Sequence, residues 1–254
     1  MPRIFAYESL TTLPLLHGLE RRLSEAGSDI VFDRKTQVDW MLAEIQGDAA
    51  LGSPLAYAKR QPEIVLLPGR AVVHRAGAGW IRLVFRQNLY DISTVAYHRE
   101  REWERLLAEI ILRESYGFTP KYIQTEAGID AALERTDAVL VAGEKALRSL
   151  ETHPSALDLV EDWIGLTDLP FVEAVWAGWE HRVNTELVDL VTGLDPDTQA
   201  LDDVLKEKGL PVEATRVLSY RFDDDAKDGV EAVFRMLFYY GLHRDVPELQ
   251  FWEG

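Results

Sequence analysis

The sequence contains no cysteine. Its absence excludes disulfides, thiolate nucleophiles, and zinc or iron–sulfur sites that use cysteine ligands. The first residues lack the long apolar segment of a signal peptide. No apolar run approaches the roughly 20 residues that a membrane-spanning helix needs. The sequence therefore predicts a cytoplasmic protein that does not enter a membrane.

Basic residues are also scarce. There are 27 lysines and arginines against 43 acidic residues, which gives a formal net charge of −16. Nucleic acids and anionic membranes require a basic surface, so the charge balance argues against both as partners. A small anion remains a possible ligand, because a local group of arginines or helix N–H groups can bind it despite the overall charge.

The chain has enough apolar sequence for a large core. It has 254 residues, of which 47% are hydrophobic, and this length fits one large domain or two smaller lobes. Short apolar segments at 4–7, 29–33 and 48–52 alternate with helical patterns at 14–27 and 38–45. Two further strands are expected at 63–67 and 80–85, with glycines at 69, 77 and 79 in turns. This alternation predicts a mostly parallel sheet covered by helices.

A second α/β unit is expected further along the chain. Strands are predicted at 93–97, 121–123 and 137–143, with helices at 101–115 and 128–134. A polar, turn-prone segment at 158–167 precedes an apolar, β-branched and aromatic run at 171–179, which is typical of a buried strand. Helices are predicted at 184–191, 199–208, 212–220 and 226–240. The predicted organisation is a first lobe of residues 1–92 plus 171–254, a second lobe of residues 93–170, and a ligand cleft between them.

One segment carries a specific resemblance. Residues 163–177 read W-x-x-L-T-x-L-P-F-V-x-A-V-W-A, which resembles the menaquinone-biosynthesis family that contains chorismate dehydratase. Segments 8–14, 48–54 and 137–147 are similar to other motifs of that family. The resemblance implies an α/β, two-lobed type 2 periplasmic-binding-protein-like fold with a helical C-terminus. It also implies a lyase that removes water from chorismate to give an enolpyruvyl-oxybenzoate, without cofactor or metal.

Two pocket segments differ from the family pattern. A serine expected to face the ligand falls on Ile81, and a hydroxyl-rich S-R-T-S motif falls on the charged segment 101–104. An alternative function is therefore a small-anion binding or sensing protein, or an enzyme for another substrate, on the same fold. Trp80 and Trp103 would favour lost activity if they filled the cleft. The sequence leaves open whether the protein is a monomer or a dimer.

A small carboxylate ligand in the cleft needs hydroxyl and guanidinium partners. Thr11 and Thr12 lie at the start of the first helix, where hydroxyls and N–H groups hold anions, although ordinary N-capping explains them equally well. Arg99 and Arg101 open a helix after a strand; the alternative is a solvated helix start paired with neighbouring glutamates. The candidate substrate-binding residues are Thr11, Thr12, Ser53, Arg82, Arg86, Arg99 and Arg101.

The six histidines are scattered, and none belongs to a spaced metal motif. His98 follows a predicted strand end, where contacts of the second lobe with a ligand are expected. Histidine titrates near neutral pH and is the commonest general base. The sequence therefore singles out His98 as the candidate catalytic residue, and it predicts no metal site.

Overall fold

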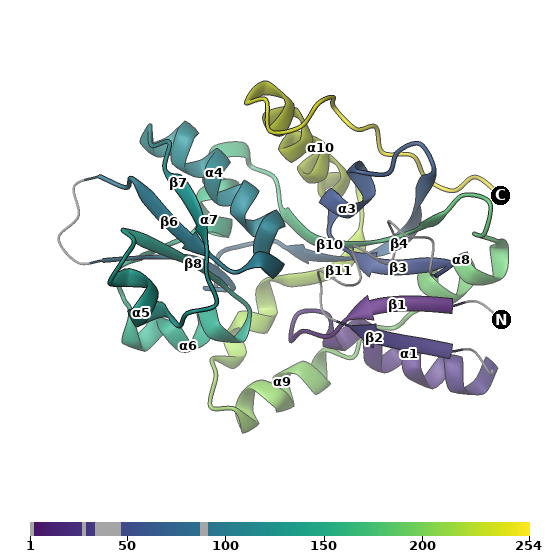
Figure 1. Ribbon diagram of the computed structural model, residues 1–254. Helices are drawn as coiled ribbons and strands as arrows, with labels where there is room; N and C mark the ends of the chain where they lie inside the picture. Colours follow the sequence, from purple (N-terminus) through teal and green to yellow (C-terminus); the bar gives the residue numbers. More distant parts are fainter. Residues whose placement is uncertain (1–2, 27–28, 34–46, 87–90) are drawn as a thin grey trace.

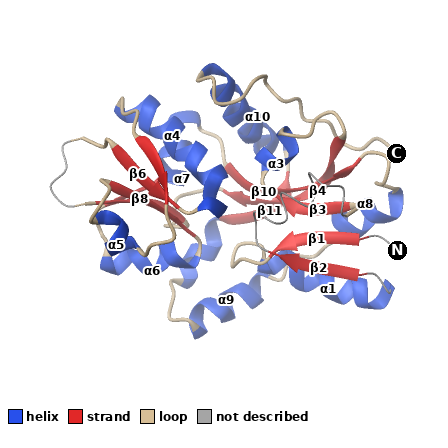
Figure 2. Cartoon of the chain, in the orientation of Figure 1, coloured by secondary structure: helices blue, strands red, loops and turns tan. Residues whose placement is uncertain are grey.

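The computed structural model describes residues 3–26, 29–33, 47–86 and 91–254. The strands form two separate sheets, and each sheet with its helices makes one lobe (Figures 1 and 2). The helix predicted at 38–45 lies outside the described residues. The α/β, two-lobed arrangement expected from the alternating strands and helices is confirmed.

The first sheet has the strand order β11-β4-β10-β3-β1-β2. Strand β1 runs parallel to β2 and β3, whereas β10 is antiparallel to both β3 and β4, and β11 is antiparallel to β4. This sheet is therefore mixed, and the prediction of a mostly parallel sheet is wrong for it. Consecutive apolar residues suit these central strands because helices bury both faces of the sheet. Its members are β1 (Arg3–Tyr7), β2 (Asp29–Asp33), β3 (Ala49–Gly52), β4 (Ile64–His74), β10 (Phe171–Trp179) and β11 (Leu218–Phe222).

The second sheet has the order β7-β6-β8-β5-β9. Strands β6, β7 and β8 are parallel, and β5 is antiparallel to β8 and β9. In parallel strands all carboxyl ends meet at one edge, which is where ligands bind in open α/β sheets. Its members are β5 (Ile81–Phe85), β6 (Thr94–Tyr97), β7 (Lys121–Gln124), β8 (Ala138–Ala142) and β9 (Ala156–Asp158).

The chain passes between the lobes twice. It leaves the first sheet after His74 and returns to it at Phe171, and these two residues are register partners in β4 and β10. The predicted lobe boundary at residue 93 placed β5 in the first lobe, but β5 pairs along its length with β8, from Ile81 opposite Ala142 to Phe85 opposite Ala138. This strand therefore belongs to the second sheet, because its hydrogen-bonding partners lie there.

Strand β10 crosses the centre of the first sheet, and all nine of its residues are buried. Its pairing with β4 is interrupted between Val172 and Ala174, which oppose the consecutive residues Val73 and Val72. Glu173 is therefore the extra residue of a β-bulge. Bulges redirect a side chain and occur often beside functional sites.

Helices cover the sheets and fill the junction between them (Figure 1). The α-helices are α1 (Leu13–Ala26), α3 (Pro54–Ala58), α4 (Glu102–Tyr116), α5 (Ile129–Leu133), α6 (Glu144–Thr152), α7 (Leu159–Thr167), α8 (Thr185–Thr192), α9 (Thr198–Glu207) and α10 (Asp224–Tyr239), and the 3₁₀ helices are η1 (Arg99–Arg101) and η2 (Val212–Val217). None of the helices in the described ranges is long and apolar enough to cross a bilayer.

Three segments differ from the sequence prediction. The helix predicted at 212–220 is the 3₁₀ helix η2 followed by strand β11, because residues 218–222 pair with the backbone of β4 and bury Tyr220 and Phe222. The turn-prone segment 158–167 is α7, whose start is capped by the carboxylate of Asp158. Gly69 lies within β4 at φ +91°, in a continuous strand rather than a turn between two strands.

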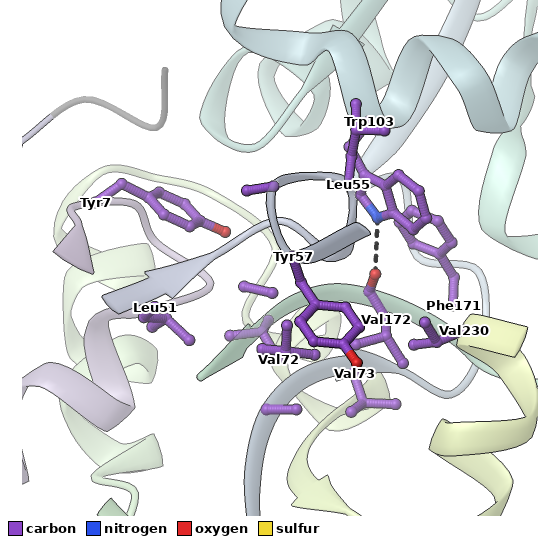
Figure 3. Packing of buried hydrophobic residues seen from close by; sticks show 14 of the residues in the cluster. Tyr7, Leu51, Leu55, Tyr57, Val72, Val73, Trp103, Phe171, Val172 and Val230 are labelled. Carbon is purple, nitrogen blue, oxygen red and sulfur yellow. Dashed lines mark hydrogen bonds between the residues drawn. The ribbon is translucent and has the colours of Figure 1, made fainter. Parts of the chain in front are cut away.

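Side chains from both lobes share one hydrophobic core. Trp103 of α4 stacks on Phe171 of β10 with ring centroids 5.9 Å apart. Its indole N–H donates to the carbonyl oxygen of Val172 at 2.8 Å (Figure 3). Trp80, which precedes β5, donates in the same way to the carbonyl oxygen of Ala214 in η2 at 2.7 Å. The two tryptophans therefore join the second lobe to segments of the first.

Candidate functional site

Buried polar side chains gather at the edge of the first sheet that meets the second lobe. Tyr7 is the last residue of β1, His74 is the last residue of β4, and Glu173 is the bulged residue of β10. Thr11 lies in the short connection between β1 and α1. All four side chains are nearly inaccessible to solvent. We refer to these four residues as the Glu173 network.

Glu173 accepts a hydrogen bond from each of the other three side chains. Its Oε1 accepts from the Tyr7 hydroxyl at 2.8 Å and from the Thr11 hydroxyl at 3.0 Å. Its Oε2 lies 2.8 Å from Nε2 of His74. Three donors around one buried carboxyl group favour its ionised form. The carboxylate in turn orients the imidazole ring and determines which ring nitrogen carries the proton.

Burial decides the protonation of the tyrosines around this carboxylate. Desolvation, followed by the nearby charge of Glu173, raises the pKa of Tyr7 well above its ordinary value. The same two causes raise the pKa of Tyr220 in β11. Both phenols therefore remain protonated at neutral pH and can act only as neutral hydrogen-bonding groups.

The second lobe presents an arginine to this network. Arg101 precedes α4 and forms an ion pair with the buried Glu104, with 3.1 Å between Nη1 and Oε1. Burial alone would lower the pKa of Arg101, but the carboxylates of Glu104 and Glu173 outweigh it and raise the pKa. The guanidinium group is therefore a permanent positive charge at the junction of the lobes.

Two buried polar atoms near Glu173 have no hydrogen-bond partner within the described part of the chain. They are Nδ1 of His74 and the hydroxyl oxygen of Tyr220. An unsatisfied buried polar atom destabilises the folded state by about 1–3 kcal/mol. Such atoms are rare in stable cores, and a ligand or water is a common partner for them.

A pocket of about 450 Å³ opens in the second lobe. It lies at the carboxyl ends of β6 and β8 and beside the first turn of α6. Its charged lining residues include Arg101, Lys145 and Arg148, together with Glu100 and Glu144. Arg148 forms an ion pair with Glu144 at 2.7 Å, within the pocket lining itself. Arg101 is paired with Glu104, which does not line the pocket, so Arg101 and Lys145 are the cations best placed for an anion. Arg101 thus belongs to the pocket and also faces Glu173.

Three residues selected from the sequence lie at this junction. Thr11 is in the Glu173 network, and Arg101 connects that network with the pocket. His98 also lines the pocket, but its Nε2 lies 2.5 Å from the carboxylate of Glu126 and its Nδ1 lies 3.7 Å from that of Glu100. The structure therefore brings Thr11, His98 and Arg101 to one region.

The other selected residues near the first lobe have local partners. The Thr12 hydroxyl is fully buried and donates to the carbonyl oxygen of Tyr7 at 3.0 Å, which supports the turn before α1. Ser53 caps α3 through its hydroxyl oxygen, which accepts from the N–H of Ala56. These contacts give both residues a structural role at the edge of the first sheet.

The remaining arginines lie away from the Glu173 network. Arg82 points into the second lobe, where it donates to the Ser149 hydroxyl at 2.6 Å and to the carbonyl oxygen of His153 at 3.0 Å. Arg86 pairs with Asp137 at 2.8 Å. Arg99 is exposed in η1. The structure does not bring these three arginines together.

Sequence reasoning missed Tyr7, His74 and Glu173 as site residues. Two signals were present: Glu173 is the one charged residue in the apolar run 171–179, and His74 ends another apolar segment. A charged residue in a buried strand needs partners, but the sequence alone does not identify them. Within the described ranges no group of three or more acidic or histidine side chains is arranged to hold a metal ion.

Comparison with known proteins identifies the family. Residues 3–191 match the family described as menaquinone biosynthesis. The chain belongs to the menaquinone biosynthesis family. The matched range includes all four residues of the Glu173 network, Arg101 and the whole of the second lobe.

One protein similar to this chain is a chorismate dehydratase of Thermus thermophilus. It is 30% identical over 145 residues, which are 50% of this chain and 53% of that protein. The match thus spans about half the length of the relative.

Solved structures that are similar to this chain have the same fold. A protein from Archaeoglobus fulgidus has a TM-score of 0.66 at 16% identity, covering 95% of this chain and 98% of that one. The periplasmic aliphatic sulphonate binding protein of Escherichia coli has a TM-score of 0.59 at 14% identity, with 98% and 94% covered. An alkanesulfonate-binding protein of Xanthomonas axonopodis, bound to MOPS, has a TM-score of 0.61 at 16% identity, with 98% and 95% covered. The fold is therefore periplasmic-binding-protein-like.

Proposed function

We propose that the protein is a chorismate dehydratase-like lyase, which removes water from chorismate to give an enolpyruvyl-oxybenzoate for menaquinone biosynthesis. The observation that carries the proposal is the 30% identity to a chorismate dehydratase within a chain that belongs to the menaquinone biosynthesis family. The reaction breaks one C–O and one C–H bond, and formation of the aromatic ring provides much of its driving force.

The geometry of the junction supports this reaction. Chorismate carries two carboxylates, and the second-lobe pocket offers Arg101 and Lys145 beside a cavity of about 450 Å³, within the range of small-molecule sites. Arginine binds carboxylates through two parallel hydrogen bonds, which also fixes the orientation of the ring. The Glu173 network lies on the other side of Arg101 and supplies ionisable groups for proton transfer.

Turnover of chorismate tests the proposal directly. We expect the purified protein to convert chorismate into a product lighter by one water, detected by chromatography with mass detection. Chorismate also decays without enzyme, so a heat-denatured sample provides the background rate. Product formation at the background rate across neutral pH would contradict the proposal.

Two observations favour a second function, the binding or sensing of a small anion. Trp80 and Trp103 fill space between the lobes, and Thr11 already donates to Glu173. A protein of this kind would bind chorismate or a sulphonate such as MOPS, raising its melting temperature without turnover. Thermal unfolding with each compound, followed by analysis of the recovered ligand, separates binding from catalysis.

A further inference from the structure

The contact between His74 and Glu173 has the features of an acid–base pair. The two side chains are 0% and 5% exposed, and 2.8 Å separates Nε2 from Oε2. A carboxylate in this position orients the imidazole ring, as the aspartate does in hydrolytic triads. The two residues lie 99 positions apart in the sequence and meet only because β4 and β10 are neighbours.

The pair is more polar than packing alone requires. Glu173 interrupts a strand in which the other eight residues are apolar, and it needs a bulge to reach its partners. Nδ1 of His74 lacks a hydrogen-bond partner among the described residues, which destabilises the folded state. Replacing buried ion pairs by apolar residues is often neutral or stabilising, so a stability role does not account for this pair.

We propose, on the basis of the dehydration proposed above, that Glu173 and His74 form its acid–base pair. Glu173 contacts the substrate and transfers the proton, and His74 is a positioning residue that orients the carboxylate and shares its charge. Arg101 holds the ring carboxylate of chorismate from the second lobe, so that the reacting carbons face Glu173.

The stereochemistry of chorismate suits a single proton-transferring group. The enolpyruvyl ether and the hydroxyl are trans on adjacent ring carbons, so the hydrogen on the ether-bearing carbon and the hydroxyl lie on the same face. Glu173 removes that hydrogen as a proton, and the C–H electron pair becomes the new ring double bond. The C–O bond to the hydroxyl breaks, and the departing oxygen takes the proton from Glu173 and leaves as water. The pair ends in its starting protonation state, and no oxidant or reductant is needed.

The charges around the pair fit this cycle. Arg101 neutralises the negative charge that the ring carboxylate accumulates when the proton leaves, while Glu104 keeps the guanidinium in place. Tyr7 and Thr11 hold Oε1 of Glu173 as neutral donors. Tyr220 on β11 faces Glu173 as a further neutral hydroxyl.

Helix α4 and the residues before it cover Glu173 in the present arrangement of the lobes. Trp103 of this helix bonds to the backbone of Val172, adjacent to Glu173. Movement of the second lobe away from the first would therefore uncover Glu173 and separate it from Arg101, leaving room for the ring between them. Such closure around a ligand is the common motion of two-lobed binding folds.

The test compares Glu173→Gln and His74→Gln with Glu109→Gln as the matched control. Glu109 is also a buried, ion-paired glutamate, but it lies on α4 with Arg105 and Arg113 as partners. We expect Glu173→Gln to lower kcat for chorismate by about 10²–10⁴-fold with KM little changed, because only proton transfer is lost. We expect His74→Gln to lower kcat at least about tenfold and to change its pH dependence. Glu109→Gln should keep kcat within about threefold.

The outcomes separate this inference from the proposed function. Wild-type protein without turnover overturns the dehydratase function and, with it, the acid–base pair. Active wild type with an equally active, folded Glu173→Gln variant overturns the pair alone. If Glu173→Gln does not fold, Thr11→Val replaces it, because it removes one donor and leaves the carboxylate. The low-pH limb of the kcat profile should then move to higher pH, since a carboxylate with fewer donors binds a proton more readily; an unchanged profile overturns the pair.

Discussion

The two lobes bring different kinds of polar chemistry to their junction. On the first lobe the polar side chains are buried and bonded to one another, and their positions are fixed by strands β1, β4 and β10. On the second lobe the charges surround an open pocket and stand on helix starts and loops. The first arrangement suits a reaction that needs accurate placement, and the second suits the capture and release of a ligand. Under the proposed function, chemistry and recognition are therefore divided between the lobes.

The largest effect is expected from removing the centre of the buried network. Glu173→Leu leaves Tyr7, Thr11 and His74 without their common acceptor, and we expect the free energy of unfolding to fall by about 3–5 kcal/mol. Denaturant unfolding measures the change. Glu180→Leu, at an exposed position next to the same strand, should stay within about 0.5 kcal/mol. If the free energy of unfolding falls as little for Glu173→Leu as for Glu180→Leu, the Glu173 network does not stabilise the first lobe.

The next largest effect is expected at Arg101, which lines the pocket and lies near the Glu173 network. Arg101→Gln keeps a polar side chain but removes the charge, and we expect about ten- to hundredfold weaker binding of the enolpyruvyl-oxybenzoate product, in line with the loss of a charge-assisted hydrogen bond. Calorimetric titration gives the affinity. Arg99→Gln is the control, because Arg99 is exposed at the other end of the same 3₁₀ helix. Equal affinities of the two variants would contradict the role of Arg101.

A smaller effect is expected at the rim of the pocket. Lys145 is exposed at the start of α6, so solvent weakens its attraction for an anion. We expect Lys145→Ala to weaken product binding by about two- to fivefold, with a stronger effect at low salt. Lys121→Ala, an equally exposed lysine on β7, should not change the affinity. A larger loss at Lys145 than at Arg101 would place the ligand nearer to α6.

The smallest effect is a dependence of stability on pH. Burial alone would raise the pKa of Glu144, but Arg148 and Lys208 outweigh it and lower the pKa below its ordinary value of 4.5. The ion pair of Lys208 with Glu144, at 3.1 Å, therefore stabilises the folded state above about pH 4.5, and this contribution is lost as the pH falls through the lower folded value. Lys208→Ala should lower the melting temperature slightly at pH 7 and not at all well below pH 4.5. A difference that is independent of pH would contradict this assignment.

Much of the fold could be predicted from the sequence because its strands are short apolar runs between turn signals. The strand at 171–179 is a continuous apolar run, and the helix around Leu107 and Ile111 has helical spacing, and both patterns are local in the sequence. Strand β11 was missed because its five residues form a strand by pairing with β4, which is distant in the sequence. Pairing between distant strands is a tertiary property, so β5 was also assigned to the wrong lobe.

The candidate site was predictable only in part for the same reason. Thr11 and Arg101 follow strands and precede helices, which is a local pattern that indicates ligand contacts. His74 and Glu173 lie inside apolar segments, where single polar residues do not reveal their partners. Their contact depends on the register of β4 against β10 and on the bulge at Glu173, and neither can be read from residue types.

The chain passes from the first lobe to the second and back only once, so the second lobe is a single insertion into the first. Its two ends join the first sheet at His74 and Phe171, which are opposite one another in β4 and β10. The pocket residues from His98 to Arg148 all lie within that one segment, whereas the Glu173 network lies outside it. We therefore expect that exchanging this one contiguous segment between relatives changes the ligand preference and leaves the Glu173 network in place.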